Sequence, residues 1–318
     1  MTKKVVIVGT GAVGSTCAYT LLLQEIADTI VLVDINKDRT VADSLDMTHA
    51  LPFTNLSPKQ IISGEYSDAA DADLVIITAN APAAQLKAGD SRLSLLVGNV
   101  AMIKDITTSV MASGFDGIFL IASNPVDLIT RIVAEVSGLP KSRVIGTGTL
   151  LDSARMKTII ADKLQVNPND INGCVMGEHG ESSFTAWSNA QIFTLPLDDY
   201  IQKEGLEKPD FDQIDNEIRQ VGFDIFQKKG NTSYGIASAL ATIARAIFRN
   251  ESTILPVSSY LSSPIYDVKN LYIGIPTVIS EQGAEKIIEL ELTTSEQEKF
   301  RKSAKILEQN FDSISAEL

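Results

Sequence analysis

The first 34 residues constrain the fold more strongly than any other stretch of the chain. An apolar run at residues 5–8 is followed by a glycine-rich turn at residues 9–14, a helical pattern and a second apolar run at residues 30–33. Asp34 comes directly after that run, 20 residues beyond the last glycine of the turn. This order predicts a strand, a tight turn, a helix and a parallel strand that ends in an acid.

Each part of this unit matches a requirement of dinucleotide binding. Glycines let the backbone turn tightly and approach a pyrophosphate, and the helix N-terminus supplies N–H groups and the positive end of its dipole. Asp34 would bind the ribose hydroxyls and repel a 2′-phosphate, which favours NAD over NADP, although Lys37 and Arg39 lie close by. A tight turn without a ligand is the alternative, and the complete order of elements favours the dinucleotide.

The alternation of strands and helices continues through the first half of the chain. Helical patterns fall near residues 39–50, at 93–111 and after Pro125, and the apolar strand patterns fall at residues 73–79, 117–123 and 143–146. Continuous apolar strands between helices predict a parallel sheet that is covered on both faces.

The pattern changes in the second half of the chain. Helices are predicted at residues 209–229 and 235–248, antiparallel strands at 252–259, 271–280 and 286–292, and a last helix opens with capping residues from Thr293. We therefore expect an α/β fold. A Rossmann-type doubly wound parallel sheet forms a dinucleotide-binding domain at 1–147, and an α+β substrate-binding domain follows at 148–318.

Composition and charge exclude several classes of partner. The net charge of −13 argues against nucleic acid and anionic membranes, and no apolar run approaches the length of a membrane span. The N-terminus lacks the apolar core and cleavage site of a signal peptide. Cys17 and Cys174 lie among apolar residues without metal-ligand spacing, so we expect buried free thiols, no metal site and a cytoplasmic protein.

One of the two histidines, His179, stands between glycines in the segment 177–180, just after the apolar run 174–176. That run predicts a buried strand, so His179 is expected where the strand ends and the backbone turns. Histidine is the side chain whose ordinary pKa allows proton exchange near neutral pH. A lone histidine of this kind is more often a core or turn residue, and its role depends on the rest of the chain.

Other polar residues occur where elements of the predicted fold begin or end. Asn124 follows a strand at the sheet edge where open α/β sheets bind ligands. Asp152 and Arg155 lie three residues apart, on one face of a helix predicted at residues 150–164. Arg92 stands at a helix start after a long loop rich in small residues. Taken singly, these are a turn former, a surface ion pair and a solvated arginine.

Together the residues form a set that one reaction needs. A nicotinamide cofactor delivers hydride to a carbonyl carbon, and the carbonyl oxygen then takes a proton, which a protonated His179 can supply. A carboxylate partner, Asp152, would raise the pKa of the histidine and fix its tautomer. Arg155 can bind a substrate carboxylate bidentately, and Arg92 would polarise the carbonyl once water is excluded.

This order of segments resembles the L-lactate and malate dehydrogenase family over essentially the whole chain. The matching pieces are residues 9–14, Asp34, 90–92, 123–127, 151–155 and 177–180. The resemblance implies that His179 is the general acid and base, with Asp152, Arg92 and Arg155 in the roles given above. It also implies that Asn124 contacts substrate and that Thr232 lines the substrate pocket. The cofactor contacts that it implies are Gly9, Gly11, Val13, Gly14, Asp34, Thr78, Ala79, Asn99, Ser123 and Asn124.

Two departures from the family pattern affect what the resemblance implies. The position that distinguishes substrates falls at Leu86, beside Gln85, in a loop about three residues longer than usual. No arginine precedes Arg92 in that loop, so malate is disfavoured, and the longer loop resembles the L-2-hydroxyisocaproate dehydrogenase branch. Members activated by fructose 1,6-bisphosphate carry an arginine and a histidine where this chain has Lys157 and Asn172, so we expect no such activation.

We therefore expect an NAD-dependent L-2-hydroxyacid dehydrogenase, with pyruvate and L-lactate as the first substrates and a homotetramer or dimer as the assembly. An enzyme for larger 2-oxo acids, of the hydroxyisocaproate type, is the alternative within the class. A non-catalytic NAD(H)-binding sensor is the alternative from another class, and the intact set of four polar side chains argues against it. A metal-dependent glycosidase on a similar fold would need metal ligands that the sequence does not offer.

Overall fold

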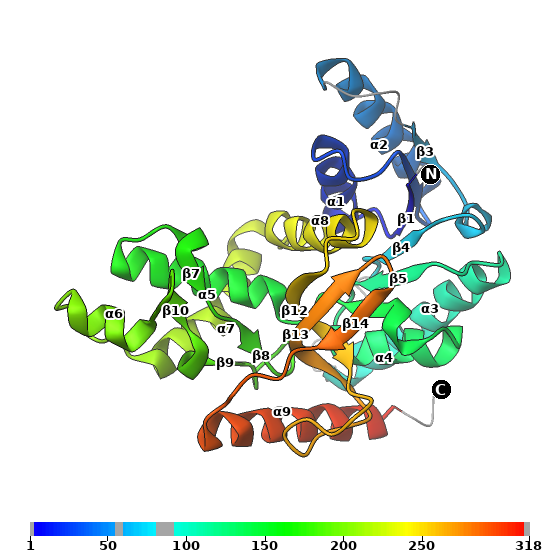
Figure 1. Ribbon diagram of the computed structural model, residues 1–318. Helices are drawn as coiled ribbons and strands as arrows, with labels where there is room; N and C mark the ends of the chain where they lie inside the picture. Colours follow the sequence, from blue (N-terminus) through cyan, green and yellow to red (C-terminus); the bar gives the residue numbers. More distant parts are fainter. Residues whose placement is uncertain (1–2, 55–59, 81–91, 315–318) are drawn as a thin grey trace.

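The central feature of the computed structural model is a nine-stranded sheet (Figure 1). The structure describes residues 3–54, 60–80 and 92–314, without the side chains of 92–97. Six strands run parallel in the order β3-β2-β1-β4-β5-β6. They are β1 (Lys4–Val8), β2 (Thr29–Val33), β3 (Gln60–Ser63), β4 (Leu74–Ile77), β5 (Ile118–Ile121) and β6 (Val144–Gly146).

Side chains on the two faces of these strands pack against different helices. Val6 and Val8 of β1 belong to a core cluster with residues of α3 (Arg92–Ala112), α4 (Val126–Ser137) and α9 (Thr294–Asp312). Val5 and Ile7 face the opposite cluster, with α1 (Ala12–Leu23) and α8 (Tyr234–Phe248). Because successive side chains of a strand point to opposite faces, this alternation confirms a doubly wound sheet. On its outer edge, α2 (Lys37–Ala50) packs beside β3.

Three antiparallel strands from the second half of the chain extend the same sheet beyond β6. They are β12 (Thr253–Tyr260), β13 (Tyr272–Ser280) and β14 (Gly283–Ile287), in the order β6-β12-β13-β14. The strand predicted at residues 286–292 is therefore wrong in position. The chain turns back at Gly283, whose φ is +93°, and it leaves the ladder after Ile287, where Leu290 and Leu292 pack into the core instead.

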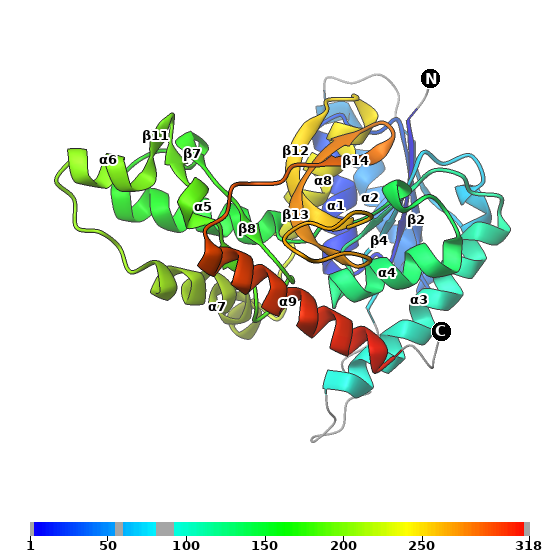
Figure 2. The same ribbon diagram turned by 60° about the horizontal axis from the view of Figure 1, so that its bottom comes forward.

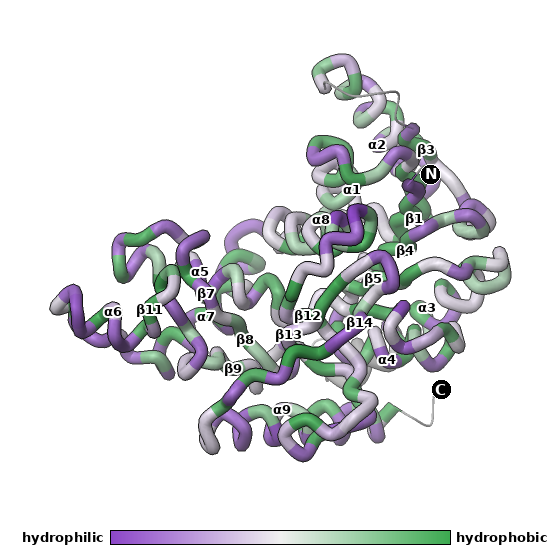
Figure 3. The backbone as a smooth tube through the Cα atoms, viewed as in Figure 1, coloured by the Kyte–Doolittle hydropathy of each residue, from purple (hydrophilic) through white to green (hydrophobic). Residues whose placement is uncertain are grey.

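A second lobe lies beside the sheet and has a core of its own (Figure 2). It contains α5 (Leu150–Leu164), α6 (Leu197–Lys203) and α7 (Phe211–Lys229), whose apolar faces meet in one cluster. The lobe's short strands are β7 (Ile171–Asn172), β8 (Val175–Met176), β9 (Phe184–Thr185), β10 (Gln191–Ile192) and β11 (Leu195–Pro196). In Figure 3 hydrophilic residues mark the outer helix α6, while apolar residues run along the central strands.

The last helix connects the lobe to the sheet. Thr293 and Glu296 form the expected capping box at its N-terminus, and α9 then contacts both β9 of the lobe and α4 under the sheet. The second half of the chain also packs directly on the parallel sheet, since β12–β14 extend the sheet and α8 packs on α1. The division into domains at 1–147 and 148–318 therefore stays a prediction.

Among the residues that the structure describes, no helix is both long enough and apolar enough to span a membrane. Cys17 and Cys174 are buried free thiols, as the sequence predicted.

Candidate active site

The glycine turn after β1 is packed tightly against Ala79, two residues beyond the end of β4. Gly9 has φ +91°, and a Cβ added to it would stand 2.6 Å from the backbone N and Cα of Ala79. A Cβ on Gly14, in the first turns of α1, would stand 2.0 Å from the carbonyl oxygen of Gly9. Real side chains do not tolerate such contacts, so only glycine fits at these two positions.

Gly11, by contrast, faces open space, and a Cβ added there would meet nothing within 4 Å. It is the N-cap of α1, whose first turn carries no acidic side chain. An uncrowded helix N-terminus beside a glycine turn is suited to an anion such as a pyrophosphate. The backbone around Gly11 thus fits the dinucleotide that the sequence predicts.

Asp34 lies directly after β2 with its carboxylate against the glycine turn. One carboxylate oxygen accepts hydrogen bonds from the backbone N of Thr10 at 2.7 Å and from its hydroxyl at 3.3 Å. The other accepts from the backbone N of Asn36 at 3.0 Å. Lys37 forms its ion pair with Glu65 at 2.6 Å. The neighbouring lysine is therefore engaged away from the Asp34 carboxylate.

The other predicted cofactor residues connect the loops that leave the carboxyl ends of the strands. The Thr78 hydroxyl donates to the Gly9 carbonyl at 2.5 Å, and the Ser123 hydroxyl donates to the Ala79 carbonyl at 2.5 Å. Asn99 Nδ2 donates to the Asn124 carbonyl at 3.0 Å. These bonds hold the ends of β1, β4 and β5 together at one edge. Val13 lies beside this edge, half-buried in the first turn of α1.

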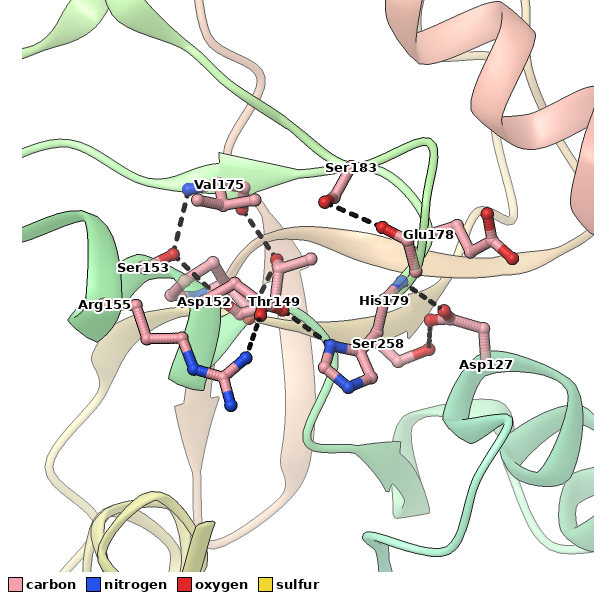
Figure 4. Close-up of polar contacts among 12 residues, drawn as sticks. Asp127, Thr149, Asp152, Ser153, Arg155, Val175, Glu178, His179, Ser183 and Ser258 are labelled. Carbon is pink, nitrogen blue, oxygen red and sulfur yellow. Dashed lines mark hydrogen bonds and ion pairs between the residues drawn. The ribbon is translucent and has the colours of Figure 1, made fainter. Parts of the chain in front are cut away.

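Three residues predicted for chemistry, His179, Asp152 and Arg155, meet in the second lobe, as Figure 4 shows. His179 follows β8, and its Nδ1 donates to a carboxylate oxygen of Asp152 at 2.6 Å. The other oxygen of Asp152 accepts from Nη1 of Arg155 at 2.9 Å. Asp152 is buried in the first turn of α5 and joins the two cationic groups. The sequence predicted this association, and the structure brings the three side chains together.

His179 and Asp152 shift each other's pKa because they lie in direct contact. The Asp152 carboxylate raises the pKa of His179 from its ordinary 6.5 to about 8, against the opposing effect of burial. Burial alone would raise the pKa of Asp152, but the charges and hydrogen bonds of His179 and Arg155 outweigh it and lower that pKa below its usual value. The protonated imidazole is therefore favoured at neutral pH.

A cavity of about 300 Å³ opens beside this group. His179, Asp152 and Arg155 form one side of it, and the other lining residues include Arg219, Gly222, Phe226 and Thr232. Thr232 therefore lines the same cavity as His179, and its role in binding substrate stays a prediction. A Cβ added to Gly222 would stand 2.9 Å from Nη2 of Arg155, so the guanidinium lies directly against the backbone of α7.

Sequence reasoning missed two residues at this site. Arg219 of α7 lines the cavity and donates to the Ser183 carbonyl at 2.6 Å. Asp127 of α4 accepts a hydrogen bond from the backbone N of His179 at 2.9 Å. Arg219 lies on α7, whose sequence pattern predicts an acidic amphipathic helix. Nothing in that pattern indicated that this arginine would line the cavity. Asp127 belongs to the segment 123–127, but an acid in the first turn of a helix is ordinary, so its position gave no signal for a role at the site.

Part of the predicted site lies beyond what the structure describes. Gln85 and Leu86 fall outside the described residues. Arg92 is the first residue of α3, and its side chain is likewise not described. Their assigned roles stay predictions.

Lys157 and Asn172, the two positions weighed for a sugar bisphosphate, line one shared cavity of about 480 Å³. Within the described ranges, no group of three or more histidine, cysteine, aspartate or glutamate side chains is arranged to hold a metal ion.

Two family models together match nearly the whole chain. The model of the lactate/malate dehydrogenase NAD binding domain matches residues 3–146, and that of the lactate/malate dehydrogenase alpha/beta C-terminal domain matches residues 149–318. The chain is 46% identical to L-lactate dehydrogenase of Pediococcus pentosaceus, over 96% of this chain and 93% of that protein. It is 45% identical to L-lactate dehydrogenase 1 of Listeria monocytogenes, over 98% of this chain and 96% of that protein.

Solved structures show the same likeness. A lactate dehydrogenase from a Medee basin deep-sea metagenome library superposes with a TM-score of 0.94 at 38% identity, covering 99% of this chain and 100% of that one. The minor L-lactate dehydrogenase of Enterococcus mundtii in its ligands-bound form gives a TM-score of 0.93 at 38% identity, covering 98% of both chains. The chain therefore belongs to the lactate/malate dehydrogenase family, as its ordered motifs indicated.

Proposed function

We propose that this protein is an NAD-dependent L-lactate dehydrogenase that interconverts pyruvate and L-lactate. The observation that carries the proposal is the bonded series Arg155–Asp152–His179 on the wall of one cavity. It supplies a proton donor and a carboxylate anchor side by side. The L-lactate dehydrogenases of Pediococcus pentosaceus and Listeria monocytogenes support the same substrate.

His179 exchanges the proton in this proposal. Its Nδ1 is bonded to Asp152, so proton exchange with the substrate oxygen falls to Nε2. The raised pKa keeps the imidazole protonated at neutral pH, the form that pyruvate reduction consumes. In the reverse direction the neutral imidazole accepts the hydroxyl proton of lactate.

Arg155 binds the substrate carboxylate. One of its nitrogens is bonded to Asp152, and a guanidinium has five N–H donors, so it can hold a second carboxylate while staying paired. Because Arg155 and His179 share Asp152, the carboxylate and the reacting carbonyl oxygen of a 2-oxo acid can be held at once. Arg92, at the start of α3, is assigned to polarise that carbonyl.

The glycine turn and Asp34 would hold the cofactor, which supplies or accepts the hydride when bound. The backbone around Gly11 would receive the pyrophosphate, and the Asp34 carboxylate the ribose hydroxyls. Thr78, Asn99 and Ser123 would border the nicotinamide half, at the same edge as Asn124. We assign these contacts to residues 1–147 and the substrate contacts largely to residues 148–318.

Substrate choice is tested by kcat/KM for pyruvate, 2-oxoisocaproate and oxaloacetate with NADH. We expect pyruvate to be used best. A preference for 2-oxoisocaproate would favour the hydroxyisocaproate alternative, and equal or better use of oxaloacetate would refute the interpretation of the loop before Arg92. Tight NADH binding without turnover of any 2-oxo acid would indicate the sensor.

We further propose a homotetramer that fructose 1,6-bisphosphate does not activate. Val41, Leu45 and Phe53 are apolar and exposed along α2 and the turn after it, and a second copy could bury them. Sedimentation velocity tests the assembly, and a monomer at micromolar concentration would contradict it.

Activation by fructose 1,6-bisphosphate is tested by assays at subsaturating pyruvate with and without the bisphosphate. We expect no activation, because Lys157 and Asn172 together provide only one cation.

We place the enzyme in the cytoplasm, where NADH is available and the free thiols of Cys17 and Cys174 stay reduced. Cell fractionation tests this placement.

A further inference from the structure

Three successive backbone N–H groups leading to the imidazole are held by three different elements. Gly177 N donates to the Gly274 carbonyl of β13 at 3.0 Å. Glu178 N donates to the Ser303 hydroxyl of α9 at 2.7 Å. His179 N donates to an oxygen of Asp127, on α4, at 2.9 Å. The backbone of the histidine is therefore fixed from one side while Asp152 holds the ring from the other, as Figure 4 shows.

Asp127 differs from the other two anchors because it is charged. The residue is 2% exposed, and its second carboxylate oxygen accepts from the Ser258 hydroxyl of β12 at 2.6 Å. A buried carboxylate is costly unless it is hydrogen-bonded or faces a positive charge. Two hydrogen bonds satisfy it here, and the nearby imidazole gains a negative neighbour in addition to Asp152.

We propose that Asp127 is a positioning residue for His179, which fixes the backbone of the histidine and, as a second carboxylate, favours the protonated imidazole. The consequence for turnover rests on the proposed function. The electrostatic part does not, because it can be measured on the histidine itself.

Several charged groups shift the pKa of His179, and Asp127 is one of them. Asp152 on α5 has the largest effect and raises the pKa of His179, Asp127 raises it further, and Arg155 lowers it. Glu178, beside His179 in the loop, acts on Asp127 and raises its pKa. Arg219 and Glu181 line the same cavity.

Asp127 is negatively charged in the pH range in which His179 gains or loses its proton. Burial raises its pKa to about 6, although the hydrogen bonds from Ser258 and His179 oppose the rise. It is therefore ionised where His179 titrates, near pH 8.

The experiment is a pH titration of the imidazole signals by NMR in the full-length protein. The chain has two histidines, so His49 on α2 serves as an internal control. In Asp127→Asn, which keeps an oxygen acceptor and removes the charge, we expect the pKa of His179 to fall by roughly half a pH unit. Ser303→Ala is the matched variant, because it removes the neighbouring backbone anchor without changing any charge. It should leave that pKa close to its wild-type value.

An unchanged pKa in Asp127→Asn, or an equal fall in Ser303→Ala, would overturn the proposal. Should Asp127→Asn not fold, the wild-type protein supplies the test. The ring signals of His179 should show a second, smaller inflection near pH 6, where Asp127 titrates, and a single inflection would refute the coupling.

Kinetics separate this inference from the proposed function. If the function is right, the alkaline fall of kcat/KM for pyruvate should move to lower pH in Asp127→Asn by the same amount as the imidazole pKa. If no 2-oxo acid is turned over, the function fails, while the NMR result still decides the role of Asp127.

Discussion

The substitution Asp152→Asn tests the central electrostatic claim about the site. The Asp152 carboxylate is the largest cause of a His179 pKa of about 8 in place of 6.5, a difference that corresponds to about 2 kcal/mol in favour of the imidazolium. Asparagine keeps the size of the side chain and removes the charge. Because burial lowers the pKa of His179, we expect the variant's pKa to return to 6.5 or below.

The loss of activity can be worked out from that change. At pH 7.5 an imidazole with a pKa of 8 is about three-quarters protonated, and one with a pKa of 6.5 is about one-tenth protonated. Ionisation alone therefore lowers kcat/KM for pyruvate reduction about eightfold at this pH. A larger loss would measure the orientation and tautomer that Asp152 also provides.

The assay is kcat/KM for pyruvate across pH 5.5–9.5, with NADH saturating. Reduction uses protonated His179, so activity should be level below the pKa and fall above it. That fall should begin near pH 8 in the wild type and below pH 7 in Asp152→Asn, and lactate oxidation should show the opposite dependence. Asp162→Asn, an exposed aspartate farther along the same helix, is the matched control. An alkaline limb that stays near pH 8 in Asp152→Asn would refute the reasoning.

Three further predictions concern the substrate anchor and the cofactor turn. Arg155→Lys should raise KM for pyruvate by about 10- to 100-fold with a smaller change in kcat, since lysine cannot form the bidentate pair; steady-state kinetics with a near-normal KM would contradict the anchor. Asp34→Ser should narrow the preference for NADH over NADPH, measured as the ratio of their kcat/KM values, and an unchanged ratio would mean that another group selects the cofactor. Gly14→Ala should weaken NADH binding in fluorescence titrations and lower Tm, because the new Cβ would meet the Gly9 carbonyl oxygen at 2.0 Å; an unchanged Kd and Tm would show that the turn relaxes at little cost.

Elements with a strong local pattern could be predicted from the sequence. The helix predicted at 150–164 has the same bounds as α5, because the apolar positions recur at helical spacing. The strand, turn and helix at the N-terminus were likewise recognisable from local order alone. Of the two-residue strands in the second lobe, only β8 was predicted, from the apolar run 174–176. The others were missed, since pairs such as Ile171 and Asn172 are too short to show any period.

The chemistry of the site could be predicted further than its geometry. His179 and Asp152 each stand at the end of an element, where a polar side chain among apolar neighbours is conspicuous. Their spatial contact was inferred from the needs of one reaction and is now observed at 2.6 Å. Arg219 could not be found in this way, because it lies in a polar helix and reaches the cavity only through the packing of α7 on α5.

Asp127 shows where the limit of local inference lies. An acid in the first turn of a helix is explained fully by the helix dipole and the unpaired N–H groups of that turn, so its sequence position indicates nothing more. In the fold its carboxylate bonds with Ser258 and the backbone of His179, which are 131 and 52 residues away. The parallel sheet places the start of α4 at the edge where β12 and the histidine loop arrive from the second half of the chain. The role of the side chain thus follows from which elements converge on it, and that convergence is a property of the fold as a whole.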